Sequence, residues 1–466
     1  MNAQIGTLEN PLRIAIIGSG PSGFYAADHL QKQKDLIVQI DMFDRLPTPF
    51  GLVRGGVAPD HAKIKSVTKV YDKIAADPNF RFYGNVEFGK DLTHADMLKF
   101  YHQVIYAVGA QTDKKMEIPG EDLPGSHPAT EFVAWYNGHP DYRDYKFDLT
   151  QECAVVVGVG NVAMDVARIL ASSYDELVKT DMADYALEAL KNSKVREIYL
   201  LGRRGPAQAA FTNPEVKELG ELEETDAIAD INEVTLDPLS KAALETNPDS
   251  TIQKNIEIMT GYATQSPKGK PKRLFMRFLV SPVEITGKDR VEAVKIVKNE
   301  LFQNKDGTLR PRATDKFETI KAGLIFRSIG YKGVALPDIP FHDSWGVIPN
   351  KDGRVHDPKN DKIVEGEYVV GWIKRGPSGV IGTNKPDSQA TVNMMLEDLK
   401  QNKCFSPALP KREALESMLC EKKVKFVTFG EWQKLDRLEI QKGQALGRPR
   451  LKFTRVEEML GALEKK

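Results

Sequence analysis

The apolar positions of this chain fall into short runs, several of which end at a glycine and lead into a helical pattern. The first run opens "LRIAIIGSGPSGFYAADHL" (Leu12–Leu30) and is rich in β-branched residues, as buried strands are. The runs "LIVQIDMFD" and "QVIYAVGA" (Gln103–Ala110) follow, and the latter stops at a glycine. Because strand-like and helix-like stretches alternate through the first 110 residues, the pattern predicts an α/β fold.

A second strand–glycine–helix unit begins at "CAVVVGVGNVAMDVARIL" (Cys153–Leu170). A helical stretch (Asp175–Asn192), the strand "VREIYLLGRR" and a strand-rich polar stretch near Phe275–Val297 follow. "AGLIFRSIGY" (Ala322–Tyr331) then ends another strand at a glycine. The pattern predicts two Rossmann-like, three-layer dinucleotide-binding domains, one inserted into the other: residues 111–329 lie within a discontinuous domain of residues 1–110 and 330–466.

The tail beyond about Lys403 is charged. It predicts a helix in "KREALESMLCEKKVKF" and a loop in "GRPRLKF", but the pattern does not indicate what the tail does.

Composition limits the possible functions. A chain of 466 residues is too long for one ordinary hydrophobic core. It has 65 basic and 65 acidic residues, so no net charge favours binding to nucleic acid or a membrane. No signal peptide, presequence or membrane span is recognisable. The three cysteines show no spacing typical of a redox pair, a zinc site or an iron–sulfur site. We therefore expect a cytoplasmic protein without a metal, bound to neither nucleic acid nor a membrane.

The first glycine turn has the G-x-G-x-x-G spacing that lets a backbone approach a pyrophosphate at a helix N-terminus, with Gly18, Gly20 and Gly23. Asp44 lies 21 residues past Gly23, about where an acid meets ribose hydroxyls in this fold. The turn therefore suits FAD or NAD. A bare structural turn is the alternative.

The second turn carries Gly158, Gly160 and Ala163 in G-x-G-x-x-A spacing. Here Arg203 and Arg204 follow the next strand, and arginines at that place accommodate a 2′-phosphate, which indicates NADP. The pair lies 45 residues beyond Gly158, so this interpretation requires Asp175–Asn192 to be an inserted helical segment. Otherwise the arginines belong to a surface loop.

A third segment, "VVGWIKRGPSGVIGTNKPDSQATVNMMLEDL", predicts a strand, a Gly/Pro-rich loop and a helix that begins near Asp387. The N-terminus of such a helix favours a bound anion, and the reduced flavin ring is anionic. Gly379 permits close backbone approach, and Trp372 either packs on a cofactor ring or lies in an ordinary core.

In their order and spacing, "IAIIGSGPSGFYAA", "LPTPFGLVRGGVAPDHAKIK", "YAVGA", "GVGNVAMDVARIL", "GRRGPAQAAFT" and "GWIKRGPSGVIGTNK" closely resemble the adrenodoxin reductase family of ferredoxin–NADP reductases, especially its bacterial members. The resemblance covers nearly the whole chain. It implies FAD in the split domain, NADP(H) in the inserted domain, and transient contact with a small, acidic ferredoxin-type iron–sulfur protein; a monomer is favoured.

The resemblance also implies site residues. FAD is expected to contact Gly18, Gly20, Ser22, Gly23 and Asp44 at its adenine end, Leu52 and Val86 in its middle, and Trp372, Gly379, Val380 and Ile381 at its isoalloxazine end. NADP is expected to contact Val159, Gly160, Asn161, Val162, Arg203, Arg204, Glu215 and Gly379. His61 and Glu215 match a polar pair near the nicotinamide and flavin, and are the candidate catalytic residues.

Three positions qualify this picture. Lys114 stands where relatives commonly have an arginine that contacts NADP. A flexible lysine ammonium group thus replaces a planar guanidinium group. Lys217 takes a position often used to dock acidic ferredoxins, or it simply lies on a solvated helix face. His61 is a candidate for proton or hydride handling or for shaping the pocket, while Asp60 could cap the following helix.

The resemblance predicts hydride transfer from NADPH to flavin N5, followed by one-electron steps to the acceptor. The absence of a cysteine pair argues against a disulfide relay. Two alternatives stay open. One is an NADPH diaphorase, or a subunit of a larger flavoprotein complex, with a different acceptor; the other is a regulator that binds both nucleotides without turnover.

Overall fold

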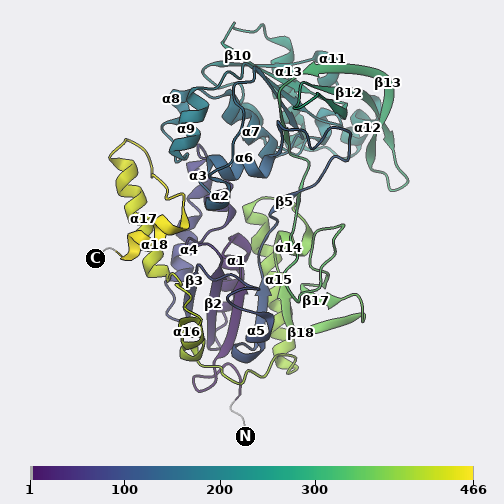
Figure 1. Cartoon of the computed structure of the whole chain (residues 1–466). Helices are drawn as coiled ribbons and strands as arrows, with labels where there is room; N and C mark the ends of the chain where they lie inside the picture. Colours follow the sequence, from purple (N-terminus) through teal and green to yellow (C-terminus); the bar gives the residue numbers. More distant parts are fainter. Residues whose placement is uncertain (1–3, 465–466) are drawn as a thin grey trace.

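The structure, a computed structural model that describes residues 4–464, consists of two α/β lobes (Figure 1). The first lobe is built on a seven-stranded sheet in the order β16-β17-β18-β4-β1-β2-β3. Its strands are β1 (Leu12–Ile17), β2 (Val38–Asp44), β3 (Phe80–Gly84), β4 (Gln103–Tyr106), β16 (Asn350–Lys351), β17 (Arg354–Asp357) and β18 (Lys362–Val369). Strands from both ends of the chain thus share one sheet, and helices α1 (Pro21–Gln31) and α15 (Asn384–Lys400) pack together on it.

The second lobe is built on a six-stranded parallel sheet in the order β6-β14-β7-β8-β10-β9. Its strands are β6 (Ser126–Pro128), β7 (Cys153–Val157), β8 (Glu197–Leu201), β9 (Thr225–Ala229), β10 (Lys272–Arg277) and β14 (Leu324–Arg327). A separate antiparallel sheet of β11 (Val280–Thr286), β12 (Ala293–Gln303) and β13 (Leu309–Lys321) completes this lobe. The predicted α/β fold with two Rossmann-like units is confirmed, while the exact boundaries at residues 110 and 330 stay a prediction.

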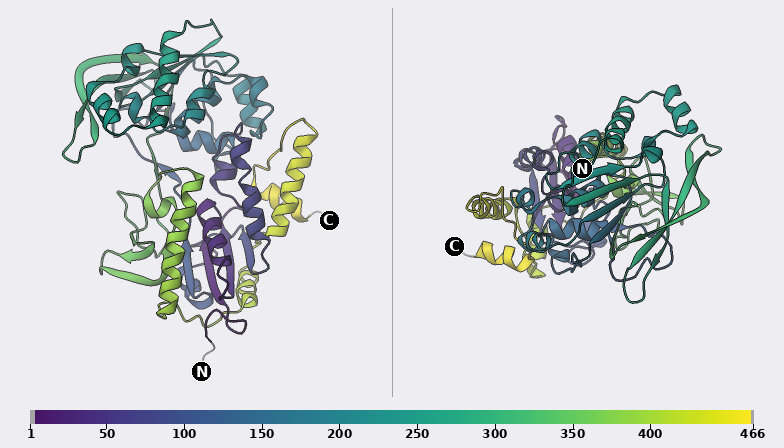
Figure 2. Two further views of the ribbon diagram at one scale, coloured as in Figure 1. Left: turned by 180° about the vertical axis from the view of Figure 1, so that it is seen from behind. Right: turned by 90° about the horizontal axis from the view of Figure 1, so that it is seen from above.

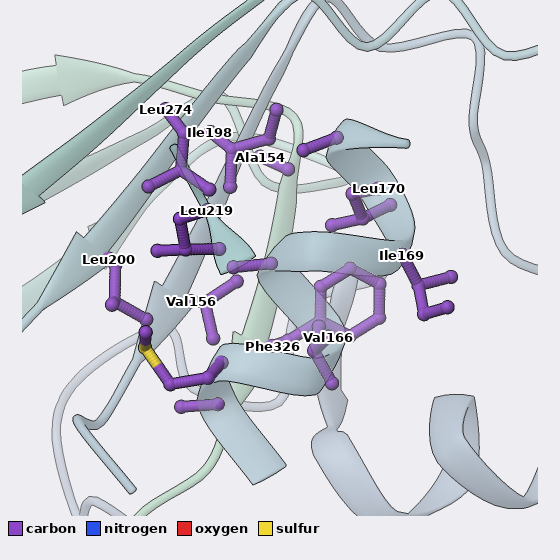
Figure 3. Close-up of a cluster of buried hydrophobic side chains, with 14 of the residues drawn as sticks. Ala154, Val156, Val166, Ile169, Leu170, Ile198, Leu200, Leu219, Leu274 and Phe326 are labelled. Atoms are coloured by element: carbon purple, nitrogen blue, oxygen red, sulfur yellow. The ribbon is translucent and has the colours of Figure 1, made fainter. Parts of the chain in front are cut away.

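An apolar core fixes helix α7 (Asn161–Ala171) on the second sheet (Figure 3). Val166, Ile169 and Leu170 of the helix belong to the same buried cluster as Val156 and Phe326 of the sheet, and all five are at most 1% exposed. Fully burying an aliphatic or aromatic side chain contributes about 1.5 to 3 kcal/mol. The core therefore sets where the N-terminus of α7 points, which is where the second glycine turn lies.

The chain passes between the lobes twice, and the two passages pair with each other. Strand β5 (Thr112–Asp113) on the way out forms an antiparallel ribbon with β15 (Tyr331–Lys332) on the way back. We call these paired strands the crossing ribbon. In Figure 1 the ribbon lies on the side of the molecule opposite the C-terminal helices.

The C-terminal tail contains α16 (Arg412–Glu421), α17 (Phe429–Gln444) and α18 (Val456–Glu464). Helix α16 falls within the predicted helical stretch, and the predicted loop "GRPRLKF" (residues 447–453) contains neither helix nor strand. Both views of Figure 2 place α17 and α18 at the edge of the molecule, and the left view places them beside both lobes. Among residues 4–464, no helix has the length and apolarity that crossing a membrane requires.

The predicted helical stretch Asp175–Asn192 is present as two short helices, α8 (Tyr174–Leu177) and α9 (Asp184–Lys191). The Arg448 guanidinium donates to the carbonyls of Thr180 and Met182 in the turn between them. Helix α15 begins three residues before Asp387. A proline in its first turn costs no helical bond, since N–H groups there have no partner within the helix.

Candidate active site

One cavity of about 1530 Å³ runs between the lobes, and both glycine turns line it. Pockets for single small molecules are typically about 300 to 1,000 Å³. The cavity is therefore larger than a pocket for one small molecule and has room for two dinucleotides.

The first turn is shaped by three glycines with different roles. Gly18 has φ +106, and a Cβ added there would lie 2.6 Å from the Ala107 carbonyl oxygen. A Cβ on Gly20 would meet open space, whereas one on Gly23 would lie 2.4 Å from the Gly18 oxygen. Gly18, Gly20 and Ser22 line the cavity, but Gly23 instead allows α1 to pack closely on the turn.

Asp44 lies at the end of β2 and lines the same part of the cavity. Its Oδ2 accepts hydrogen bonds from the Ser19 backbone N–H at 3.1 Å and from the Ser19 hydroxyl at 2.5 Å, which holds the glycine turn closed. Val86 does not line the cavity: its side chain is buried, and its N–H donates to the Asp44 carbonyl at 2.9 Å. Contact of Asp44 with a ribose, and of Val86 with FAD, stay predictions.

The predicted isoalloxazine contacts form a further group of cavity-lining residues. Trp372, Gly379, Val380 and Ile381 all line it, and so does Leu52 of the short helix α2 (Leu52–Gly55). The Trp372 ring stacks on Tyr331 at a centroid distance of 5.4 Å, and its Nε1–H donates to the Ser378 carbonyl at 3.1 Å. Because Trp372 is only partly buried and faces the cavity, the alternative that it lies in an ordinary core is wrong.

The second turn repeats the geometry of the first. Gly158 has φ +131, and a Cβ there would lie 2.1 Å from the Ser328 carbonyl oxygen, while Gly160 faces open space. All four predicted residues of this turn line the cavity: Val159, Gly160, Asn161 and Val162. Helix α7 starts here, and the N–H groups of its first turn would favour an anion at this place.

Arg203 and Arg204 follow β8 and line the cavity. The helical insertion that their spacing from Gly158 requires is present, since α8 and α9 lie between α7 and β8. No carboxylate partner is recorded for either guanidinium among the described residues, and Arg204 donates only to the Gln208 carbonyl at 3.4 Å. Burial and the neighbouring Arg203 charge lower the pKa of Arg204. Two adjacent cations without a counter-ion suit a doubly charged phosphate.

His61 and Glu215 come together across the lobes, with His61 Nδ1 3.8 Å from Glu215 Oε1. The shorter contact of the imidazole, however, is to a residue that the sequence reasoning missed: His61 Nε2 and Glu218 Oε2 are hydrogen-bonded at 3.0 Å. Glu218 lies one turn after Glu215 on α10 (Asn213–Glu218), so the helical period was the available signal. Asp165 is a third carboxylate at the same imidazole, 3.8 Å from Nδ1.

Arg168 of α7 binds three carboxylates of this cluster. Its side chain is 3% exposed and donates to both carboxylate oxygens of Asp60, at 2.7 and 3.0 Å, and to Asp165 at 2.7 Å. A further bond of 3.0 Å goes to Glu215. Asp60 is therefore not the helix cap considered above: the N-cap of α3 (Ala62–Lys65) is His61, and no side chain caps that helix. Arg168 thus ties the segment that carries His61 to the second lobe.

The cluster holds more acid groups than cations, and this shifts their protonation. Burial, and then the Asp165 charge, raise the pKa of Glu215 to about 7. Burial alone would lower the pKa of His61, but the hydrogen bond to Glu218 and the adjacent carboxylates leave it raised. Near neutral pH the cluster therefore binds protons that these groups would partly release in an unfolded chain.

We expect Glu215→Gln to reduce the dependence of stability on pH. A carboxyl whose folded-state pKa lies above its ordinary 4.5 favours the folded state at low pH, and this stabilisation is lost as the pH rises through about 7. The free energy of unfolding of the wild type should fall by about 1 to 3 kcal/mol more than that of the variant between about pH 5 and pH 8. Urea denaturation at the two pH values measures this. Glu221→Gln, at an exposed carboxylate paired with Lys217, is the control and should retain the wild-type decline.

Two further predicted positions are lysines, and only Lys114 lines the cavity. Lys114 lines the cavity beside Gly330, to whose carbonyl its own N–H donates at 3.0 Å. Lys217 is 69% exposed on α10 and pairs with Glu221 at 3.0 Å. A role for Lys217 in docking stays a prediction.

Comparison with known proteins agrees with this geometry. Residues 12–201 match the family described as pyridine nucleotide-disulphide oxidoreductase. The chain is 46% identical to NADPH-ferredoxin reductase FprA of Mycobacterium leprae, over 96% of this chain and 97% of that protein, and 38% identical to the mitochondrial NADPH:adrenodoxin oxidoreductase of Arabidopsis thaliana, over 97% and 95%. Among solved structures, Mycobacterium tuberculosis FprA in complex with NADPH matches with a TM-score of 0.91 and 44% identity, over 97% of this chain and 100% of that chain.

The similarity extends along both lobes and includes the tail. It covers far more than the glycine turns, which many nucleotide-binding proteins share. The chain belongs to the adrenodoxin reductase family of NADPH-ferredoxin reductases.

Proposed function

We propose that this chain uses bound FAD to transfer electrons between NADPH and a small ferredoxin-type iron–sulfur protein. The observation that carries the proposal is a single cavity lined by two dinucleotide turns of opposite character. An acid, Asp44, follows the first turn, and two arginines, Arg203 and Arg204, follow the second without a carboxylate partner among residues 4–464. A protein that bound one nucleotide would need only one of these turns.

The residues present fit both cofactors. For FAD, the turn at Gly18 and Gly20 offers open backbone, Asp44 an acceptor for ribose hydroxyls, and Trp372 with Gly379 a wall for the flavin ring. For NADP(H), the turn at Gly160 offers the pyrophosphate site and the two arginines the 2′-phosphate site.

When bound, FAD supplies the redox chemistry, since it accepts two electrons as hydride and returns them singly. The chain aligns the two ring systems and controls protons beside them. The His61 imidazole, hydrogen-bonded to Glu218, lines the cavity and can hold or release a proton there. The three cysteines are free, and none lines the cavity, so the protein itself offers no dithiol for the electrons.

The first test is the visible spectrum of the purified protein, recorded without oxygen before and after one equivalent of NADPH. We expect flavin bands that bleach on addition. Bands that persist would favour a nucleotide-binding regulator, and the absence of flavin after reconstitution with FAD would contradict the assignment of the first turn.

The acceptor needs its own measurement. A ferredoxin-dependent rate that half-saturates in the micromolar range would support the proposal, whereas reduction of quinones or dyes without a ferredoxin response would favour a diaphorase. We further propose that the ferredoxin is acidic and binds transiently, and that the protein works as a monomer in the cytoplasm. The exposed Lys217 supports an acidic partner, and the three unpaired thiols support a reducing compartment.

A further inference from the structure

Lys452 lies in the C-terminal loop between α17 and α18, and its side chain is 2% exposed. Its ammonium group meets three segments of the chain. It donates to the carbonyl of Asn137 in the second lobe at 3.1 Å and to the carbonyl of Arg54 in the first lobe at 3.4 Å. It also pairs with Asp181 of the second lobe at 3.3 Å. One cation thus joins the tail to both lobes.

The two carbonyls that Lys452 binds belong to segments that line the cavity. Arg54, Gly55 and Gly56 follow Leu52, the predicted flavin contact, and Asn137 and Gly138 lie across from them. Gly138 has φ +77, and a Cβ there would lie 3.2 Å from the Thr454 methyl group and 3.8 Å from the Lys452 Cβ. The tail loop therefore packs directly behind the wall where the two lobes meet at the cavity.

The loop is anchored on both sides of Lys452. On one side, Arg448 donates to Asp184 at 2.5 Å and to the Thr180 carbonyl at 3.1 Å, both in the second lobe. On the other side, the Phe453 N–H donates at 2.9 Å to Glu439 of α17, a fully buried carboxylate that also accepts two bonds from Arg54, at 2.5 and 2.8 Å. These contacts hold the ammonium group of Lys452 in place.

We propose that Lys452 is a positioning residue for the reaction between the two bound nucleotides. By binding the carbonyls of Arg54 and Asn137, it fixes the position of the segment that carries Leu52 relative to the second lobe. The inference rests on the proposed function, because this position matters only if nicotinamide and flavin must be aligned. Burial lowers the pKa of Lys452, while the charge of Asp181 opposes this shift. A replacement that keeps a shorter hydrogen-bond donor tests the role of the hydrogen bonds.

The experiment compares Lys452→Met, which removes all donors, with Lys452→Gln, which retains a short donor. Lys425→Gln is the control, since Lys425 is an exposed tail lysine paired with Glu464. Hydrogen exchange followed by mass spectrometry, on protein with and without FAD, reports on residues 52–57 and 137–142. Stopped-flow reduction by NADPH gives the limiting rate of flavin reduction and the half-saturating NADPH concentration.

In Lys452→Met we expect faster exchange in both segments and no change in α13 (Ser250–Thr264), which lies away from the C-terminal helices in Figure 1. The limiting rate of flavin reduction should fall about 10-fold or more, with less than about threefold change in half-saturation, because a misplacement of about 1 Å can cost 100-fold in rate. Lys452→Gln should lie between Lys452→Met and the wild type, and Lys425→Gln should match the wild type.

Unchanged exchange and an unchanged limiting rate in folded, FAD-loaded Lys452→Met would overturn the inference. If Lys452→Met does not fold, the same criteria apply to Lys452→Gln. Failure of the proposed function is distinguishable, because it would appear as a wild-type flavin that NADPH does not reduce, whatever the exchange experiment shows.

Discussion

Replacing both Arg203 and Arg204 by glutamine should raise the half-saturating NADPH concentration by about two decades or more and leave that for NADH nearly unchanged. Each charge-assisted hydrogen bond to a phosphate contributes about 1.5 to 3 kcal/mol, so two contribute roughly 3 to 6 kcal/mol, or about two to four decades. NADH lacks the 2′-phosphate and cannot gain from these bonds. Initial rates with each coenzyme, measured with a dye acceptor, give the comparison.

The matched control is the double variant Arg273→Gln with Arg312→Gln. It removes the same net charge from the same lobe, but both side chains are exposed and already paired with glutamates. Its half-saturating concentrations should stay within about threefold of the wild type, as exposed ion pairs contribute little. Equal losses for NADPH and NADH in the Arg203 and Arg204 variant would show that these residues serve something other than the 2′-phosphate.

Replacing Arg168 by methionine should lower the free energy of unfolding by about 3 to 5 kcal/mol, the usual cost of leaving buried charges without their partner. The guanidinium is 3% exposed and binds Asp60, Asp165 and Glu215, and in its absence His61 remains paired with Asp165 and Glu215, 3.8 Å from each. The midpoint of urea denaturation measures the loss.

Adding Asp165→Asn to Arg168→Met provides the check on the cause. If uncompensated negative charge is the reason for the loss, removal of one carboxylate should recover part of the stability, and Asp165→Asn alone in the wild type should be destabilising. A double variant that is less stable than Arg168→Met would point instead to lost packing of the arginine side chain.

Much of the fold and of the nucleotide sites was predictable because their requirements are local. The positive φ at Gly18 and at Gly158 requires glycine, so the glycines in the sequence indicate the two turns. The apolar run before each turn indicates the strand. The charge that follows the next strand, at Asp44 or at Arg203 and Arg204, then separates the two cofactors. The structure brings nearly all of these residues to one cavity.

The polar cluster around His61 was only partly predictable, because it depends on contacts between distant segments. Arg168 and Asp60 are separated by 108 residues, and no period or motif connects them. Glu218 could have been found from its helical spacing to Glu215, but nothing in the sequence tells which of the two the imidazole binds. Lys452 likewise resembles any lysine of a charged tail until the fold buries it.

The crossing ribbon has a mechanical consequence when it is considered together with the tail. Two passages that lie side by side, β5 and β15, leave one axis about which either lobe could swing relative to the other. The tail loop is attached to both lobes on the opposite side of the molecule (Figure 1). Attachment at a second, separate place restricts rotation about that axis, so we expect the two lobes to keep their relative orientation.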